Sequence, residues 1–262
     1  MKKDRYDFYD LLKIIEKLRS DDGCPWDREQ THQSLKKYMI EESYEALEAI
    51  DLQNDSKLKE ELGDVLLQIV LHSQIAKEEN SFDINDVIHV VSEKMVYRHA
   101  HVFGDVIANT PEEVLISWNK LKNKEKGFEK ASHILEDVPK NLPGLMRSSQ
   151  LQDKASKVGF DWDDKSGAVL KVREEIEELL ETIDTMNKDE QESEMGDVLF
   201  SLVNVCRFLK IDPETAITRT NNKFIKRFEL MEDICLKRNL QMELMTLDQL
   251  DEIWEEAKHE IG

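Results

Sequence analysis

Two short segments of the chain place carboxylates and a glycine in the same pattern. ELGDVLL at 61–67 and EMGDVLF at 194–200 each hold Glu and Asp three residues apart around Gly. Residues three apart on a helix share one face. Upstream, the EExxE runs at 41–45 and 174–178 supply a second acidic pair for each segment. The predicted metal ligands are Glu42, Glu45, Glu61 and Asp64, and in the second copy Glu175, Glu178, Glu194 and Asp197.

Four carboxylates on two facing helices repel one another. Packed helix axes lie about 8–10 Å apart, and two unit charges at about 4 Å repel by roughly 4 kcal/mol at an effective dielectric near 20. Several such pairs would rival the stability of a domain, so a cation or protons must neutralise the site. Oxygen ligands without His or Cys favour hard cations. The pattern therefore predicts Mg²⁺, with Mn²⁺ as a possible substitute.

A single glutamate run is usually a solvated helix face, so the repetition matters. A shift of 133 carries Glu42 onto Glu175, Gly63 onto Gly196 and Asp64 onto Asp197. Other shifts align cationic and tryptophan positions of the two halves in the same order. Such a collinear series indicates a duplicated module. The further pairs are Asn54 with Asn187, Lys94 with Lys223, Arg98 with Arg227, Trp118 with Trp254, and Lys122 with Lys258.

The apolar periodicity predicts helices throughout. Apolar residues recur at helical spacing in 36–50 and 58–76, with a polar turn between them, and no long period-two alternation indicates a sheet. We expect an all-α protein of two tandem helical-bundle modules. Proline and glycine gather in 123–150, which suggests a connection. The predicted organisation is a first module at 1–130, a linker at 131–145 and a second module at 146–262.

Composition excludes several classes of protein. The net charge is −20, which disfavours binding to a nucleic-acid polymer but not to a small phosphorylated ligand carried with a cation. Three dispersed cysteines indicate a reducing compartment rather than a disulfide framework. No apolar run is long enough to cross a bilayer, and the amphipathic N-terminus is unlike a signal peptide. We expect a cytoplasmic protein without membrane contact.

The chain resembles the MazG family of nucleoside triphosphate pyrophosphohydrolases in its two-module form. The resemblance rests on GCPWDREQTHQSLKKYMIEESYEALEAI, ELGDVLLQIV, RHAHVF, VGFDW, EMGDVLF and NNKFIKRF. It implies helical modules that assemble as homodimers and a Mg²⁺-dependent hydrolysis of nucleoside triphosphates to monophosphate and pyrophosphate. It also implies that the second module is the catalytic one.

The resemblance assigns further roles in the second module. It implies nucleotide contacts by Lys171, Lys223, Arg227, Trp254 and Lys258. Lys223 and Arg227 stand four apart, on one helical face suited to phosphate oxygens.

Three assignments stay open at this stage. Either Glu174 or Glu175 would orient or deprotonate the attacking water, and Trp162 would either stack on a base or close a core. The first module has Tyr38 where the second has Lys171, and Ser92 where the second has Asn221, which weakens the expectation that it turns over substrate.

Three alternatives remain on the sequence. One is a non-catalytic helical scaffold or nucleotide-binding regulator that uses the acids as a binding surface. Another is a pyrophosphatase restricted to dUTP or dCTP. A di-iron carboxylate bundle needs Glu-x-x-His from two helices, and the Glu256–His259 pattern has Lys120–Asn123 as its counterpart in the first half.

Overall fold

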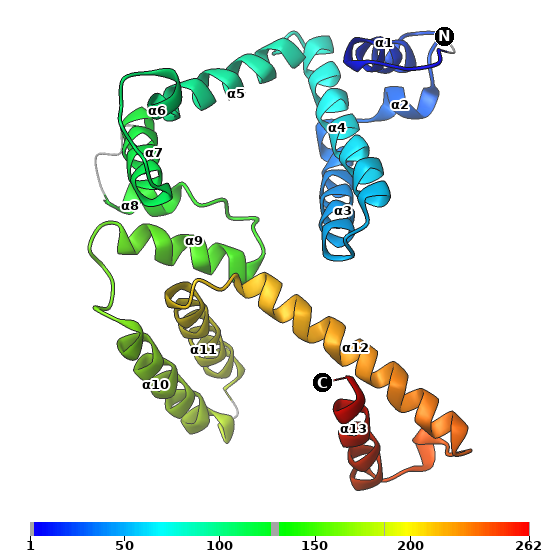
Figure 1. The fold of residues 1–262 in the computed structure, drawn as a ribbon, viewed down its shortest axis with the longest axis vertical. Coiled ribbons are helices and arrows are strands. Elements are labelled where there is room, and N and C mark those ends of the chain that lie inside the picture. The colour runs from blue at the N-terminus through cyan, green and yellow to red at the C-terminus, as the bar shows by residue number, and fades with distance from the viewer. Residues whose placement is uncertain (1–2, 127–130, 186, 262) are drawn as a thin grey trace. The chain divides into compact units, whose positions relative to one another are not determined.

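The computed structural model describes residues 3–126, 131–185 and 187–261, and these residues form helices and no strand (Figure 1). The chain divides into two compact units, Met1–Lys126 and Gly127–Gly262. Each unit contains one long helical hairpin. The prediction of an all-α protein with two tandem modules is thus confirmed.

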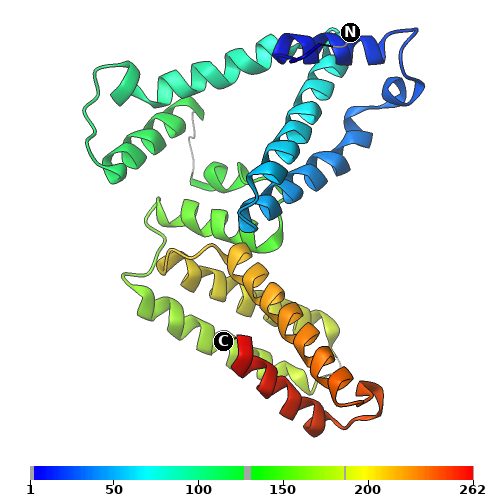
Figure 2. The ribbon, with the colours of Figure 1, turned by 45° about the vertical axis from the view of Figure 1, so that its right-hand side comes forward.

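The first unit is organised around the hairpin of α3 and α4, which lie side by side in both views (Figures 1 and 2). Thr31 caps α3 in a reciprocal pair with Ser34, and the Asn54 side chain accepts the Lys57 N–H at 3.1 Å at the start of α4. The helices are α1 (Phe8–Arg19), α2 (Pro25–Glu29), α3 (His32–Asp51), α4 (Asp55–Glu78), α5 (Ile84–Arg98), α6 (Ala100–Phe103) and α7 (Pro111–Lys126).

The core of the first unit lies where α1 packs on one end of the hairpin. Its most buried side chains come from α1, α3 and α4, with partly buried apolar residues of α1 around them. α5 leaves the end of α4 and packs against α7. The buried members are Ile15, Leu35, Val70, Leu71 and Ile75.

The second unit repeats the hairpin with α10 and α11, and α9 packs across α11 (Figure 1). Asn187 caps α11 as Asn54 caps α4, so the repeated asparagine has a structural role. α12 contacts α9 and α13, and the α12–α13 contact forms a second core that includes Met231, Ile234 and Ala257. The helices are α8 (Ala131–Glu136), α9 (Gly144–Ser156), α10 (Lys165–Ile183), α11 (Lys188–Phe208), α12 (Pro213–Lys237), the 3₁₀ turn Met242–Leu244 and α13 (Leu247–Ile261).

The two units are divided at residues 126/127, a few residues before the predicted boundary. The segment 131–145, predicted as a linker, carries α8 and the first residues of α9 and falls in the second unit. Lys154 of α9 donates to the Ile134 carbonyl at 2.9 Å and pairs with Asp137 at 2.7 Å. These bonds tie α8 and the turn after it to the rest of the second unit.

The apolar faces of both hairpins are largely exposed. Ile40, Tyr44 and Leu47 follow the predicted helical spacing on α3, yet each is more than half exposed. Leu170, Leu180 and Leu199 are similarly exposed on α10 and α11, although apolar residues at this spacing normally face a core. Hydrophobic periodicity therefore predicted the helices correctly, but not which of their faces this chain buries.

No helix among the described residues has the length and hydropathy needed to cross a membrane.

Replacing Leu35 tests the position of the first core. Leu35 is 1% exposed, so Leu35→Ala should lower the free energy of unfolding by about 2–5 kcal/mol through lost burial and the cavity left behind. Ile107→Ala, at a side chain 85% exposed, should change it by less than about 0.5 kcal/mol. Urea unfolding followed by circular dichroism measures both, and equal effects would place the core elsewhere.

Candidate functional site

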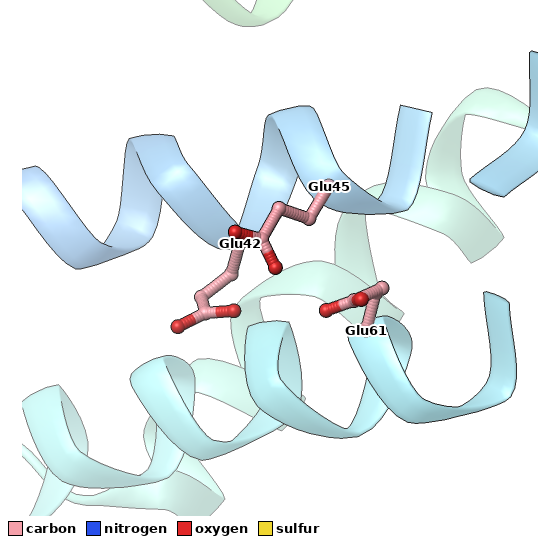
Figure 3. A group of neighbouring side chains, drawn as sticks. All are labelled: Glu42, Glu45 and Glu61. Atoms are coloured by element: carbon pink, nitrogen blue, oxygen red, sulfur yellow. The ribbon is translucent and has the colours of Figure 1, made fainter. Parts of the chain in front are cut away.

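In the first unit the α3–α4 hairpin brings three predicted ligands together. Glu42 and Glu45 extend from α3 toward Glu61 on α4 (Figure 3). One carboxylate oxygen from each lies within 4.8 Å of the others. Glu61 is buried, whereas Glu45 is exposed. Asp64 lies outside this group of three, but its charge acts on Glu42.

Crowding raises the pKa of two of these carboxyls. Burial is the main cause for Glu42, and the charges of Asp64 and Glu45 add to it. Burial also raises the pKa of Glu61, with further contributions from the charge of Glu45 and a hydrogen bond to it. Desolvation and like charge both disfavour ionisation. The charge of Lys57 on α4 opposes the shift at Glu61 but does not cancel it.

In the second unit the α10–α11 hairpin gathers Glu175, Glu194 and Asp197, again with ligand oxygens within 4.8 Å of one another. Glu175 is 6% exposed, as Glu61 is in the first unit, so each site has one buried carboxylate. Glu178 lies outside the trio but adjoins Glu175. Burial, the charge of Glu175 and a hydrogen bond to Glu175 raise the pKa of Glu178. The two predicted quartets thus appear as two trios, each with its fourth member adjoining.

Lys171 distinguishes the second site from the first. Its Nζ lies 2.6 Å from carboxylate oxygens of both Glu174 and Glu175. These hydrogen bonds raise the pKa of Lys171 well above its usual value. Tyr38, at the equivalent position, instead packs edge-on against Trp26 with ring centroids 6.2 Å apart. The first site has no lysine at this position, and its neighbouring Lys57 pairs with Glu48 rather than with a carboxylate of the trio.

The two candidates for activating water lie side by side but in different surroundings. Glu175 is buried inside the ligand trio, whereas Glu174 is exposed and belongs to neither group of converging carboxylates. The ion pair with Lys171 places Glu174 at the edge of the site.

The predicted nucleotide-contacting residues other than Lys171 gather on α12 and α13. The rings of Phe224 and Trp254 approach to 5.2 Å, and Lys258 pairs with Glu255 at 2.6 Å. The pKa of Glu255 is lowered, chiefly by the hydrogen bond from Lys258, with Arg227 among the smaller electrostatic causes. The Nε of Arg227 is buried without a partner among the described residues. Lys223 lies one turn before Arg227 on α12 and is exposed.

The corresponding arginine of the first unit is occupied. Arg98 is 8% exposed, and its Nε and Nη2 donate to one Glu125 oxygen at 3.0 and 2.9 Å. Its guanidinium also lies over the Trp118 ring, 5.5 Å from the centroid. The sequence did not predict Glu125 as a partner, because nothing in the repeat pairs it with an acid in the second unit. The first unit thus neutralises internally the arginine that the second leaves available.

The structure does not unite the acidic and cationic groups within one chain. α9 contacts both α11 and α12, whereas α13 packs on α12. Across 131–185 and 187–261, no ion pair joins the α10–α11 carboxylates to Lys223, Arg227 or Lys258. The helices themselves therefore explain the clustering within each group, but not the joining of the two groups.

The repeated glycines have open surroundings. A Cβ at Gly63 or Gly196 would meet no described atom within 4 Å. No facing backbone in the described part of the chain therefore approaches either glycine closely. Their faces are open, as are the apolar faces of the same hairpins.

Comparison with known proteins identifies close relatives along the whole chain. A family model described as MazG nucleotide pyrophosphohydrolase domain matches residues 30–103 and 165–230. A Thermotoga maritima protein named nucleoside triphosphate pyrophosphohydrolase/pyrophosphatase MazG is 49% identical over 251 residues, covering 96% of this chain and 95% of its own. An Escherichia coli nucleoside triphosphate pyrophosphohydrolase is 41% identical over 254 residues, covering 95% and 96%. Bacillus subtilis YabN is 48% identical, but the match spans 52% of that longer protein.

The raised pKa values make a testable prediction about pH. The folded chain holds protons on Glu42 and Glu61 more tightly than the unfolded chain, whose ordinary value is 4.5. Without divalent cations, their contribution to stability should therefore increase as pH falls from neutrality through the raised pKa values. Urea midpoints between pH 5 and 7 should show a weaker pH dependence in a Glu42→Gln, Glu61→Gln double variant than in the unaltered chain.

A matched control for this titration is Glu177→Gln, at an exposed side chain of α10. It should leave the pH dependence of the midpoint unchanged. An unaltered pH dependence of the urea midpoint in the double variant would show that the carboxylates of the first trio do not repel one another in the folded chain.

Proposed function

Because the chain belongs to the MazG nucleotide pyrophosphohydrolase family, we propose that its second unit hydrolyses nucleoside triphosphates to monophosphate and pyrophosphate. The convergence of Glu175, Glu194 and Asp197 beside Lys171 is the observation that carries this proposal. The relatives named nucleoside triphosphate pyrophosphohydrolase match this chain over nearly their full length, so the chain is a hydrolase.

The donor set of the second trio fits a hard divalent cation. All converging ligand atoms are carboxylate oxygens, the type that Mg²⁺ and Mn²⁺ prefer. We propose that Glu175, Glu194 and Asp197 hold Mg²⁺, with Glu178 adjoining. A bound Mg²⁺ would offset phosphate charge and lower the pKa of a coordinated water.

The protein groups around the trio suit attack at the α-phosphorus. Water adds there, the bond from the α-phosphorus to the bridging oxygen breaks, and pyrophosphate leaves with that oxygen. Glu174, fixed at the rim by Lys171, would orient the water and accept its proton. Lys223, Arg227 and Lys258 would stabilise charge on the phosphate oxygens.

Two contrasts favour the second unit over the first as the catalytic one. Tyr38 stands where the second unit has Lys171, and Lys57 of the first unit pairs with Glu48, whereas Lys171 pairs with Glu175 of the second trio. Arg98 is committed to Glu125, whereas the Nε of Arg227 is not satisfied. The first unit keeps carboxylates able to hold Mg²⁺ but has its phosphate-binding arginine neutralised.

A homodimer would supply what the single chain leaves incomplete. The exposed apolar stripes of α10 and α11 are typical of faces covered by another helix pair. The carboxylates and the α12–α13 cations are not joined within the described part of one chain, so a second copy could bring them together. We propose that the active enzyme is a dimer with the second-unit hairpins at its interface.

Substitution of two ligands tests the catalytic assignment. Glu175→Gln with Asp197→Asn removes two charges while keeping side-chain size, and should reduce Mg²⁺-dependent pyrophosphate release from ATP at least about 100-fold. The matched pair in the first unit, Glu42→Gln with Asp64→Asn, should keep most activity. Pyrophosphate is measured by a coupled assay with and without Mg²⁺ across the ribo- and deoxyribonucleotides.

Three outcomes would overturn parts of this proposal. Full activity in the second-unit variant would remove the role of its trio. Pyrophosphate release from no nucleotide would favour a scaffold or nucleotide-binding regulator. Turnover of dUTP or dCTP alone would keep the chemistry and narrow the substrate.

Charge placed on the apolar stripe tests the dimer. Leu180→Glu with Leu199→Glu alters side chains that are 58% and 47% exposed in the single chain. The double variant should sediment as a folded monomer, since buried carboxylates at an interface are costly. Leu244→Glu, at 78% exposure, should leave a dimer intact. A wild-type protein that stays monomeric at micromolar concentration would contradict the proposal.

A further inference from the structure

The GFDW segment before α10 places a tryptophan beside the second site. Trp162 is 47% exposed, although it is the largest type of apolar side chain. It lies outside both segments matched by the family model. One side of its ring faces Gly167 in the first turn of α10, where an added Cβ would come within 2.7 Å of the ring. The glycine therefore lets the indole lie against the helix backbone.

The loop that carries Trp162 is braced from two sides. Asp161 accepts from Arg207 of α11, with Oδ2 to Nη1 at 2.9 Å, and also accepts the Trp162 N–H at 2.9 Å. Asp164 caps α10 by accepting the Ser166 N–H at 2.6 Å. These bonds fix the backbone on both sides of Trp162. The exposed indole is thus held in a defined position.

The position of the indole relative to the site follows from helical spacing. Gly167, Lys171 and Glu175 are four residues apart and lie along one stripe of α10. At 1.5 Å per residue, Gly167 is about 12 Å along the helix from Glu175, with Lys171 between them. An aromatic surface, a lysine and a ligand trio therefore follow one another in the order that the base, the sugar and the phosphates of a nucleotide would require.

The first unit shows a different arrangement at the equivalent residues. Ser34 replaces Gly167, and its hydroxyl is occupied by the Gln30 side chain and the Thr31 N–H. Trp26 packs edge-on against Tyr38, at the position that Lys171 holds in the second unit. Only one of the two tryptophans thus lies against a helix backbone in line with a lysine and the carboxylates.

From this juxtaposition we propose that Trp162 is the stacking surface for the nucleobase of the triphosphate, and that Gly167 is the positioning residue that allows it. This rests on the proposed function of the second unit. Aromatic stacking tolerates every base because each has a π face. Trp162 therefore strengthens binding of purine and pyrimidine nucleotides alike rather than selecting one of them.

The test separates contact with the base from contact with the phosphates. Trp162→Ala should raise KM for ATP, GTP, CTP and UTP by about tenfold, the size of one lost base stack, with kcat changed less than about twofold. The inhibition constant of inorganic tripolyphosphate, which has no base, should not change. Trp162→Phe should keep most of the ATP affinity.

Gly167→Ala provides a second variant in which the tryptophan is retained. Alanine is the better helix former, so the melting temperature should not fall. Its Cβ would displace the indole, so KM for ATP should rise while inhibition by tripolyphosphate stays the same. Trp26→Ala is the matched control in the first unit and should leave KM unaltered.

Four outcomes overturn the role of Trp162: an unchanged KM in Trp162→Ala, an equal loss of tripolyphosphate inhibition, dissociation of the oligomer, or an unaltered KM in Gly167→Ala. Failure of the unaltered chain to release pyrophosphate from any triphosphate would instead overturn the proposed function itself.

Discussion

Repulsion among carboxylates held on packed helices is the constraint on which the site depends. A helical hairpin fixes where its side chains emerge, so Glu42, Glu45 and Glu61 cannot separate without loss of packing between α3 and α4. Burial adds a desolvation cost for Glu61 and Glu175, each 6% exposed. Such a site favours the binding of a cation, because folding has already brought the charges together and the ion relieves their repulsion. The need to hold the second helix of each hairpin in place also explains why its Asn cap is repeated together with the acids.

The two units form an internal comparison in which one scaffold meets the same constraint in two ways. In the second, Lys171 shares the charge of Glu174 and Glu175, and the Nε of Arg227 has no partner among the residues described. In the first, Tyr38 occupies the position of Lys171, and Arg98 is bound by Glu125. The cationic side chains thus decide what a trio can do beyond holding a cation. An arginine that is not paired with a carboxylate can receive phosphate, whereas an arginine already paired with a carboxylate must first give up that partner.

Much of the fold and half of the site could be predicted from the sequence, since both follow from local spacing. The i, i+3 acids, the hairpin and the repeat all depend on helical geometry, and the structure confirms the convergence of three carboxylates in each unit. Glu178 and Asp64 adjoin their trios instead of completing them, because small rotations of a helix decide which carboxylate reaches the centre. The Arg98–Glu125 pair joins α5 to α7 across a loop, and local spacing carries no information about such a contact.

The exposed apolar faces of the two hairpins are the main reason to propose a dimer. A chain with 40% apolar residues has enough to bury these stripes, yet Ile40, Leu180 and Leu199 remain exposed within the described structure. Their exposure would be costly in a monomer, since apolar surface of this extent favours removal from water. On α11 the exposed Leu199 follows Asp197 by two residues and Glu194 by five, which places it on the opposite side of the helix from these carboxylates. The proposed dimer would therefore cover the apolar side of each hairpin, while the carboxylates on the other side stay open to a cation and a triphosphate.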